Sequence, residues 1–369
     1  MELVLKKDEQ AVFALRKIYE QYGYLPYKMN RFEEYELYVR NKDFLVSDRV
    51  ITFSDRDGRL LALKPDVTLS IIKNVQNLDG GVQKLYYNEN VYRPQKSDQC
   101  FKEILQAGLE CLGDLGDYET REVVLLAMKS LEALGHPFIL DVSHMGLIGS
   151  VLERSGLTGE QKNKAMLYLR QKNCHEMKQL CSQTECENTD LLIAFTQLYG
   201  NPDQVLAEIE PLLYTQSEKD ACKELSGICK MLSDLGYGDN IRVDFSVGSD
   251  MKYYSGVVFK GYLEGLPAGI LSGGVYDKLL KKMGKPGKAI GFALYLDMLE
   301  RYEENDAGNF VDTVLLYENT ANAEELTKVC ESLRKEGSLL VCRVVPTNYK
   351  WERLMKYVNG EAVKIESNA

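Results

Sequence analysis

The chain has 369 residues, a length at which two or three domains are the usual organisation. Hydrophobic residues make up 45% and charged residues 27%, which indicates an ordinary globular protein and excludes a disordered one. The formal net charge of −10 weighs against a large nucleic-acid partner, because a protein that grips a phosphate backbone usually presents a basic face. The longest apolar run, Val123 to Met128, is too short to cross a bilayer. The first seven residues contain no apolar stretch of the length of a secretory signal, so we expect a cytoplasmic protein.

Helix and strand patterns alternate along the first 300 residues. Apolar residues recur at helical spacing up to Gly23, and an Asp-Gly pair between two apolar runs predicts a β-hairpin. In chain order, the sequence predicts a helix over 8–22, hairpin strands at 50–53 and 60–63, a helix over 69–75, paired strands over 83–92 and 101–111, a helix over 117–134, strands over 241–247 and 253–262, a helix over 276–283, a strand over 289–294 and a helix over 295–302.

Two changes of texture predict the domain organisation. Residues 155–238 are polar and helical in pattern, which is typical of a helical module inserted between strand-rich blocks. Around 303–308 the pattern is lost, so we expect one domain over 1–304 and a second over 309–369. In the second domain, strands at 311–317, 339–345 and 362–365 alternate with helices at 323–336 and 349–357, which predicts a small, mostly parallel sheet.

Generic catalytic and metal motifs are scarce. The segment Gly284 to Lys288 lacks the spacing of a phosphate-binding loop, and neither H-E-x-x-H nor G-x-S-x-G occurs. Cys174, His175, Cys181 and Cys186 offer zinc-type atoms, but their spacing matches no common zinc motif. We interpret them as surface and half-buried residues on short helices, and we expect no catalytic residue, metal or cofactor.

A set of polar residues predicts a ligand pocket instead. Gln106 and Glu110 lie four residues apart on one strand, so alternation places both on the same face. Gly108 between them leaves room for a ligand to approach the backbone. Together with Asp66 and several tyrosines, this set suits a small cationic ligand with hydrogen-bond donors, such as an amino acid with its ammonium group.

Five blocks in order resemble the histidyl-tRNA synthetase family, whose catalytic domain is of class II. The resemblance covers roughly residues 8 to 302. It is carried by the motif-like segments at 32–38, 90–110 and 289–299, by Tyr253 to Phe259, and by Gly273 to Asp277. It implies an α+β fold, with a six-stranded antiparallel sheet flanked by helices and a dimer interface at the first motif. The C-terminal segment resembles a shortened anticodon-binding α/β domain.

The departures from that family fall at positions that handle ATP. Met298 stands where the third motif has an arginine, and Val275 replaces the arginine of the G-G-R-Y-D block. Ser249-Asp250 and Ser97-Asp98-Gln99 occupy two further arginine positions, and Asn30 matches the first motif's proline. Each lost contact between a buried guanidinium and a phosphate removes on the order of 2–5 kcal/mol. The pattern predicts amino-acid binding without adenylate chemistry.

This combination resembles the regulatory subunits of ATP phosphoribosyltransferase, which are paralogues of the synthetase. The resemblance implies a non-catalytic subunit of histidine biosynthesis that binds histidine as effector and forms a homodimer within a hetero-oligomer. It implies activation and feedback inhibition of a short catalytic subunit, without tRNA or membrane contact. It assigns the ligand ammonium to Asp66, Thr68 and Gln106, the imidazole to Glu110 and Tyr254 beside Tyr253, and pocket closure to Tyr276. The arginine that usually binds the carboxylate is absent, so Arg93 is our candidate for that contact.

Two alternatives remain open at this point. One is an active histidyl-tRNA synthetase, and the other is an amino-acid-binding paralogue of the same fold with a different partner. Function has to be argued from the site, because one fold serves several functions.

Overall fold

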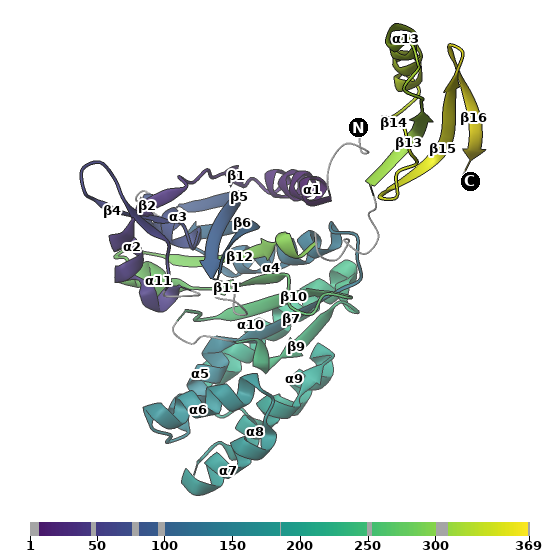
Figure 1. Cartoon of the computed structure of the whole chain (residues 1–369). Helices are drawn as coiled ribbons and strands as arrows, with labels where there is room; N and C mark the ends of the chain where they lie inside the picture. The colour runs from purple at the N-terminus through teal and green to yellow at the C-terminus, as the bar shows by residue number, and fades with distance from the viewer. Residues whose placement is uncertain are drawn as a thin grey trace. The chain divides into compact units, whose positions relative to one another are not determined.

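The computed structural model describes residues 7–45, 49–75, 81–94, 100–184, 186–248, 253–299 and 309–367. The chain divides into two compact units, Met1–Leu299 and Glu300–Ala369. The predicted boundary at 303–308 lies outside the described residues, as do Ser97-Asp98-Gln99 and Ser249-Asp250. Helices flank a central sheet in the larger unit, which confirms the predicted α+β class (Figure 1).

Among the residues that the structure describes, the sheet of the larger unit is wider than expected, with nine strands in the order β1-β5-β6-β12-β11-β10-β7-β9-β8. Its six central strands pair antiparallel throughout, as the resemblance implied. Beyond them, β1 runs parallel to β5 at one edge, and β9 runs parallel to β7 at the other. The strands are β1 (Leu25–Pro26), β5 (Val82–Pro94), β6 (Phe101–Gly113), β7 (Phe138–His144), β8 (Tyr199–Gly200), β9 (Ile241–Asp244), β10 (Val257–Leu263), β11 (Leu271–Val275) and β12 (Lys288–Tyr295).

Each face of this sheet belongs to a different hydrophobic core. Tyr86 and Leu109 join the core that helices α1 (Lys7–Gln21) and α4 (Asp117–Glu132) complete. Leu85 and Leu112, which point the other way, join a second core with α3 (Thr68–Asn74) and α11 (Asp277–Lys282). Successive side chains of each strand therefore point to opposite faces of the sheet and join different cores.

A three-stranded sheet lies beside α3 (Figure 1). Its order is β2-β4-β3, with β2 at Phe32–Glu34, β3 at Thr52–Ser54 and β4 at Leu60–Leu63. The β3–β4 hairpin is confirmed, and the Asp55 carboxylate accepts the Asp57 and Arg59 amides in its turn. Helix α2 (Tyr35–Arg40) and a 3-10 turn (Lys42–Phe44) follow β2.

Residues 145–237 are mainly helical and pack through their apolar faces onto the first core. Two of these helices begin with a capping box, in which Thr158 or Thr215 exchanges hydrogen bonds with the residue three positions later. The elements are α5 (Met145–Arg154), α6 (Gly159–Arg170), α7 (Cys174–Thr184), α8 (Thr189–Gln197), α9 (Pro202–Ile209), a 3-10 turn (Glu210–Leu212), α10 (Gln216–Leu232) and a π-type turn (Ser233–Tyr237).

Three predicted elements were wrong in part. The strand expected from Tyr253 begins only at Val257, so Tyr253 and Tyr254 lie in the preceding turn. The strand expected over 241–247 ends at Asp244, and Phe245–Val247 form a 3-10 turn. Tyr295 is the last residue of β12, so the helix expected from 295 is seen only at 297–299 within the described residues.

The helix predicted at 349–357 was wrong. This segment is strand β15 (Tyr349–Val358), which lies between β13 (Asn309–Leu316) and β16 (Glu361–Ser367). Its apolar residues fit a helical repeat, but they also alternate with polar residues, and pairing on both sides settles the outcome. The smaller unit also contains α13 (Ala323–Arg334) and β14 (Leu339–Cys342), which pairs parallel with β13.

Across the described ranges, no helix has both the length and the apolar character needed to cross a membrane.

Replacement of Gly108 by alanine tests the packing of the central strands. A Cβ at this position would lie 2.3 Å from the Phe292 carbonyl oxygen and 2.6 Å from Tyr87 Oη. We expect Gly108→Ala to lower the free energy of unfolding by about 2 kcal/mol or more, measured by urea denaturation. Gly159→Ala is the matched control, because its Cβ meets no atom within 4 Å and the site is helical. It should leave the stability unchanged or raise it by up to about 1 kcal/mol. Equal stabilities for both variants would contradict this packing.

Candidate functional site

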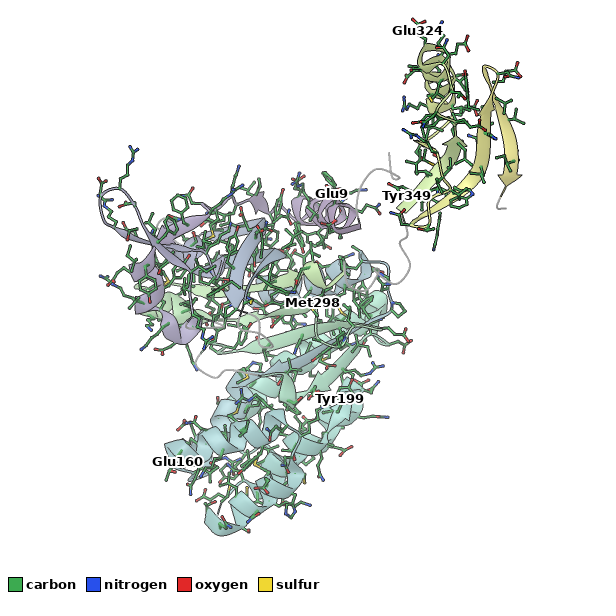
Figure 2. The ribbon with its side chains drawn as sticks, viewed as in Figure 1. Glu9, Glu160, Tyr199, Met298, Glu324 and Tyr349 are labelled. Atoms are coloured by element: carbon green, nitrogen blue, oxygen red, sulfur yellow. The ribbon has the colours of Figure 1, made fainter. Side chains whose placement is uncertain are left out.

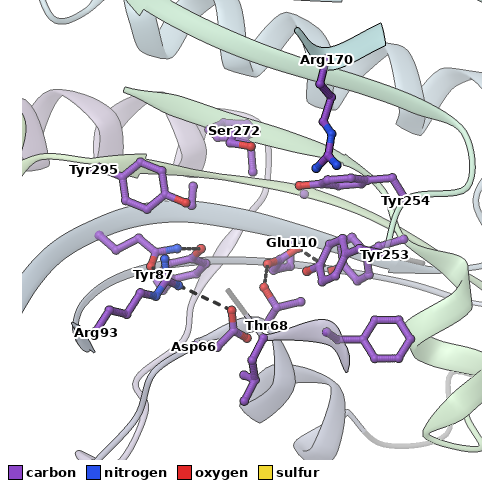
Figure 3. A pocket seen from close by; sticks show the side chains of 17 residues that line it. Asp66, Thr68, Tyr87, Arg93, Glu110, Arg170, Tyr253, Tyr254, Ser272 and Tyr295 are labelled. Atoms are coloured by element: carbon purple, nitrogen blue, oxygen red, sulfur yellow. Dashed lines mark hydrogen bonds and ion pairs between the residues drawn. The ribbon is translucent and has the colours of Figure 1, made fainter. Parts of the chain in front are cut away.

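A cavity of about 450 Å³ lies on the sheet face that carries the second core. All eight residues selected from the sequence line it, although they come from the start of α3 and the residues before it, from β5 and β6, and from the segments before β10 and after β11 (Figure 3). They are Asp66, Thr68, Arg93, Gln106, Glu110, Tyr253, Tyr254 and Tyr276. The cavity is also lined by Phe44, Leu45, Tyr87, Arg170, Ser272, Gly291, Phe292, Ala293 and Tyr295.

The floor of the cavity is set by the register of β6 against its neighbours. Gln106 lies opposite Tyr295, and Glu110 lies opposite Gly291. A side chain at Gly291 would meet Glu110 Oε2 at 1.8 Å, so glycine is needed there to leave room for the carboxyl group. The predicted role of Gly108 was wrong, because the Tyr87 phenol occupies the space beside it that a ligand was expected to use.

Glu110 is the buried acid of the site. Thr68 Oγ1 donates to its Oε1 at 2.7 Å, and Tyr276 Oη donates to its Oε2 at 2.5 Å. Burial raises the pKa of Glu110 to about 8, and the nearby Asp66 adds to this, while the two hydrogen bonds oppose it. Near neutral pH the group is therefore largely protonated and can donate a hydrogen bond to a neutral ring nitrogen, such as that of an imidazole.

Asp66 and Arg93 form a second polar group beside the floor. Their closest atoms are 3.7 Å apart, and Arg93 Nε donates to the Pro65 carbonyl at 2.7 Å. Arg93 Nη2 also donates to Gln106 Oε1 at 3.4 Å, and Gln106 Nε2 donates to Tyr87 Oη at 3.1 Å. Burial raises the pKa of Asp66, and Arg93 and the Leu69 amide partly offset this. The network fixes the direction in which Asp66 and Gln106 present their oxygen atoms.

Three tyrosines form an aromatic wall. The centroid of the Tyr253 ring lies 4.7 Å from that of Tyr254 and 5.8 Å from that of Tyr276. The Phe44 ring packs on Tyr253 with a centroid distance of 6.0 Å. Burial raises the pKa of each of the three phenols, so they remain protonated donors at neutral pH. A flat aromatic ligand ring fits against such a wall, with phenol hydroxyls available to its ring nitrogens.

Four polar lining residues were missed from the sequence. Tyr87 was within reach, because pairing of the predicted strands puts it opposite Gly108 on the same face as Gln106. Ser272 and Tyr295 lie on strands whose pairing the sequence does not reveal. Arg170 is the last residue of α6, and no local pattern indicates that this helix reaches the cavity.

Two of the positions at which the family has an arginine, Met298 and Val275, lie within the described residues, and neither lines the cavity. Met298 (Figure 2) follows β12 and is not among the lining residues. Val275, at the end of β11, packs against Gly256. Within the described part of the chain, the guanidinium groups that line the cavity are those of Arg93 and Arg170, and no group of three or more His, Cys, Asp or Glu side chains is arranged to hold a metal ion.

The antiparallel sheet and its ligand-sized cavity define a class II aminoacyl-tRNA synthetase-like fold. A family model described as histidyl-tRNA synthetase matches residues 4–299. Relatives named ATP phosphoribosyltransferase regulatory subunit include one from Caldanaerobacter subterraneus subsp. tengcongensis, 30% identical over 335 residues, which cover 88% of this chain and 87% of the relative. Another, from Alkaliphilus metalliredigens, is 28% identical over 330 residues, 86% of this chain and 83% of the relative.

Solved structures support the same fold. An ATP phosphoribosyltransferase regulatory subunit/histidyl-tRNA synthetase from Bacillus halodurans matches with a TM-score of 0.74 at 22% identity, over 95% of this chain and 93% of that chain. A chain of an ATP phosphoribosyl transferase complex from Thermotoga maritima matches with a TM-score of 0.63 at 18% identity, over 78% and 97%. The chain belongs to the histidyl-tRNA synthetase family, and within it to the group of ATP phosphoribosyltransferase regulatory subunits.

A buried ion pair supports the segment that carries Asp66. Lys64 Nζ contacts Glu89 Oε2, the Lys64 side chain is 2% exposed, and Glu89 also accepts the Met29 amide at 3.0 Å. We expect Glu89→Gln to lower the free energy of unfolding by about 3 kcal/mol, because it leaves a buried ammonium without its counter-charge. Thermal or urea denaturation measures this.

The control for that variant is Glu160→Gln, which breaks the exposed pair with Lys164 on α6. Its effect should stay within about 0.5 kcal/mol. A Glu89→Gln protein as stable as this control would show that the Lys64–Glu89 contact contributes no support.

Proposed function

We propose that this chain is a histidine-binding regulatory subunit of ATP phosphoribosyltransferase, without catalysis of its own. It joins a short catalytic subunit, makes that subunit active and relays feedback inhibition by histidine. The observation that carries the proposal is the buried Glu110, which Thr68 and Tyr276 hold by hydrogen bonds facing an aromatic wall, in a cavity large enough for an amino acid. The names of the relatives and the Thermotoga maritima complex support the partner.

The cavity provides partners for the imidazole and the ammonium group of histidine. The imidazole stacks on the tyrosine wall and shares a proton with Glu110, while Tyr254 supplies a phenol hydroxyl. The ammonium group meets Asp66, Thr68 and Gln106, which offer a carboxylate, a hydroxyl and an amide oxygen. Arg93, the sequence-based candidate for the ligand carboxylate, is placed instead as a residue that orients both acceptors through its contacts with Asp66 and Gln106.

Adenylate chemistry is proposed to be lost. Formation of an adenylate concentrates negative charge on phosphates, which guanidinium groups stabilise bidentately. Methionine at 298 and valine at 275 provide no such group, and Arg93 is engaged with Asp66 and Pro65. We therefore expect no histidine-dependent exchange of pyrophosphate into ATP, and measurable exchange would favour an active synthetase.

Regulation follows from differential affinity. Histidine inhibits the complex if it binds the less active arrangement more tightly, and the shift can be no larger than that difference in affinity. The regulatory chain is proposed to form a homodimer within the hetero-oligomer. No tRNA is included in the proposal, because the formal net charge of the chain is −10.

The first test mixes this chain with a short-form catalytic subunit from the same source. We expect the two proteins to copurify, activity to rise on mixing, and histidine to reduce that activity. Asp66→Asn should keep the complex and its activity but raise the histidine concentration needed for inhibition by about tenfold or more, since a charged hydrogen bond to the ammonium is lost. The amide oxygen of the substituted side chain can still accept the Leu69 amide, as Asp66 Oδ1 does now.

Asp57→Asn, in the exposed hairpin turn, is the matched control and should leave inhibition unchanged. Failure of the two proteins to copurify, together with no gain in activity on mixing, would exclude the regulatory role. Equal inhibition of the Asp66→Asn and unchanged complexes would remove Asp66 from the histidine site.

A second test follows the pH dependence of histidine affinity. The complex shares one proton between Glu110, with a pKa of about 8, and the imidazole, with a pKa of about 6.5. Below about pH 6.5 both free groups hold a proton and binding must release one, whereas above about pH 8 neither does and binding must take one up. Affinity should therefore be highest between these values and fall by up to about tenfold per pH unit outside them.

Glu110→Gln removes the contribution of Glu110 to the decline at high pH, so above about pH 8 its affinity should fall less steeply than that of the unchanged protein. The other groups that face Glu110 (Thr68, Asp66 and the tyrosines) and the ligand ammonium are common to both proteins, so the difference isolates Glu110. Calorimetry in two buffers of different ionisation enthalpy gives affinity and proton uptake. Glu208→Gln, at an exposed position of α9, serves as control. Identical declines at high pH for both proteins would rule out proton sharing by Glu110.

A further inference from the structure

Arg170 contributes a guanidinium group to the cavity from the helical segment 145–237, whereas the floor of the cavity is formed by the strands of the central sheet. It is the last residue of α6 and lines the same cavity as Asp66 and Glu110. Figure 3 shows its guanidinium group directed into the cavity above Tyr254, on the side away from Asp66 and Arg93. A ligand held on the floor and the tyrosine wall would therefore present its remaining group toward Arg170.

The end of α6 is anchored close to the sheet, which fixes where Arg170 begins. Leu169 is buried in the first core, and Lys172 Nζ lies 2.7 Å from Asp244 Oδ2 on β9. The same ammonium group lies 4.3 Å from the centroid of the Tyr199 ring on β8. Because Leu169 and Lys172 are both anchored, the fold fixes the backbone position from which the Arg170 side chain extends into the cavity.

The charges of the cavity favour an anionic group on the side of Arg170. Among the described lining residues, the carboxyl groups are Asp66 and Glu110, and the guanidinium groups are Arg93 and Arg170. Asp66 and Arg93 face each other and offset one another, and Arg93 donates to Pro65 and Gln106 as well. Arg170 places a guanidinium group on the side of the cavity opposite Asp66, so an anionic group of the ligand fits on that side and a cationic group fits beside Asp66.

We infer that Arg170 binds the carboxylate of the amino-acid ligand, which makes the helical segment 145–237 part of the ligand site. The inference rests on the proposed function, since it names the contact for one group of the proposed histidine. A guanidinium group binds a carboxylate bidentately, so the contact also distinguishes histidine from amines that carry the same ring. Occupancy by histidine then ties α6 to the sheet floor across the cavity.

The test compares three ligands by calorimetry: histidine, histamine, which lacks the carboxylate, and imidazolepropionate, which lacks the ammonium group. We expect Arg170→Gln to weaken histidine and imidazolepropionate by about tenfold or more and to leave histamine within about twofold. Asp66→Asn should show the complementary pattern, with histidine and histamine weakened and imidazolepropionate unaffected. Arg170→Lys should recover part of the loss, because the charge remains and the bidentate geometry does not.

Lys164→Gln is the matched control, since it removes an exposed cation from the same helix. A purely structural role of Arg170 as a basic residue at a helix C-terminus would lower stability and affect the three ligands alike. Retention by Arg170→Gln of the full preference for histidine over histamine would overturn the assignment while leaving the proposed function intact. Absence of histidine binding by the unchanged chain would overturn both.

Discussion

The buried carboxyl group of Glu110 is the constraint on which the site depends. Removing a carboxyl from water is costly unless hydrogen-bond donors meet it, and here Thr68 and Tyr276 do so from two different segments. The opposing strand contributes by having no side chain at Gly291. Strand β6, the start of α3 and the residue before α11 are thereby held in one arrangement, and the cavity is the space that this arrangement leaves between them.

The location of the cavity residues could be predicted because two kinds of information agreed. Alternation along β6 alone put Gln106 and Glu110 on one face, and the order of the blocks brought Asp66 and the tyrosines to the same place. Tyr253 and Tyr254 reached the cavity although the strand expected to carry them begins later. The block fixed their place in the chain order, and the turn geometry that directs their rings came only from the structure.

Other features could not be predicted from the sequence, because they depend on contacts between segments that are far apart in the chain. The segment 349–357 satisfies both a helical and an alternating repeat, and only its position between β13 and β16 selects the strand. The edge strands β1 and β8 have two residues each, too few to show a period. Arg170 belongs to a helix whose own pattern describes its buried face and says nothing of where its end reaches.

The two faces of the central sheet restrict how the molecule can respond to a bound ligand. Successive residues of β6 alternate between the cavity and the core beneath α1 and α4, so sliding the strand by one position would drive Ala107 and Leu109 into the polar side. The floor is therefore immobile in register. Thr68, the turn tyrosines and the end of α6 stand on separate segments around it, and motion on ligand entry is left to these walls. A structural response to ligand binding is therefore expected in the loops and helix ends around the cavity rather than in the strands.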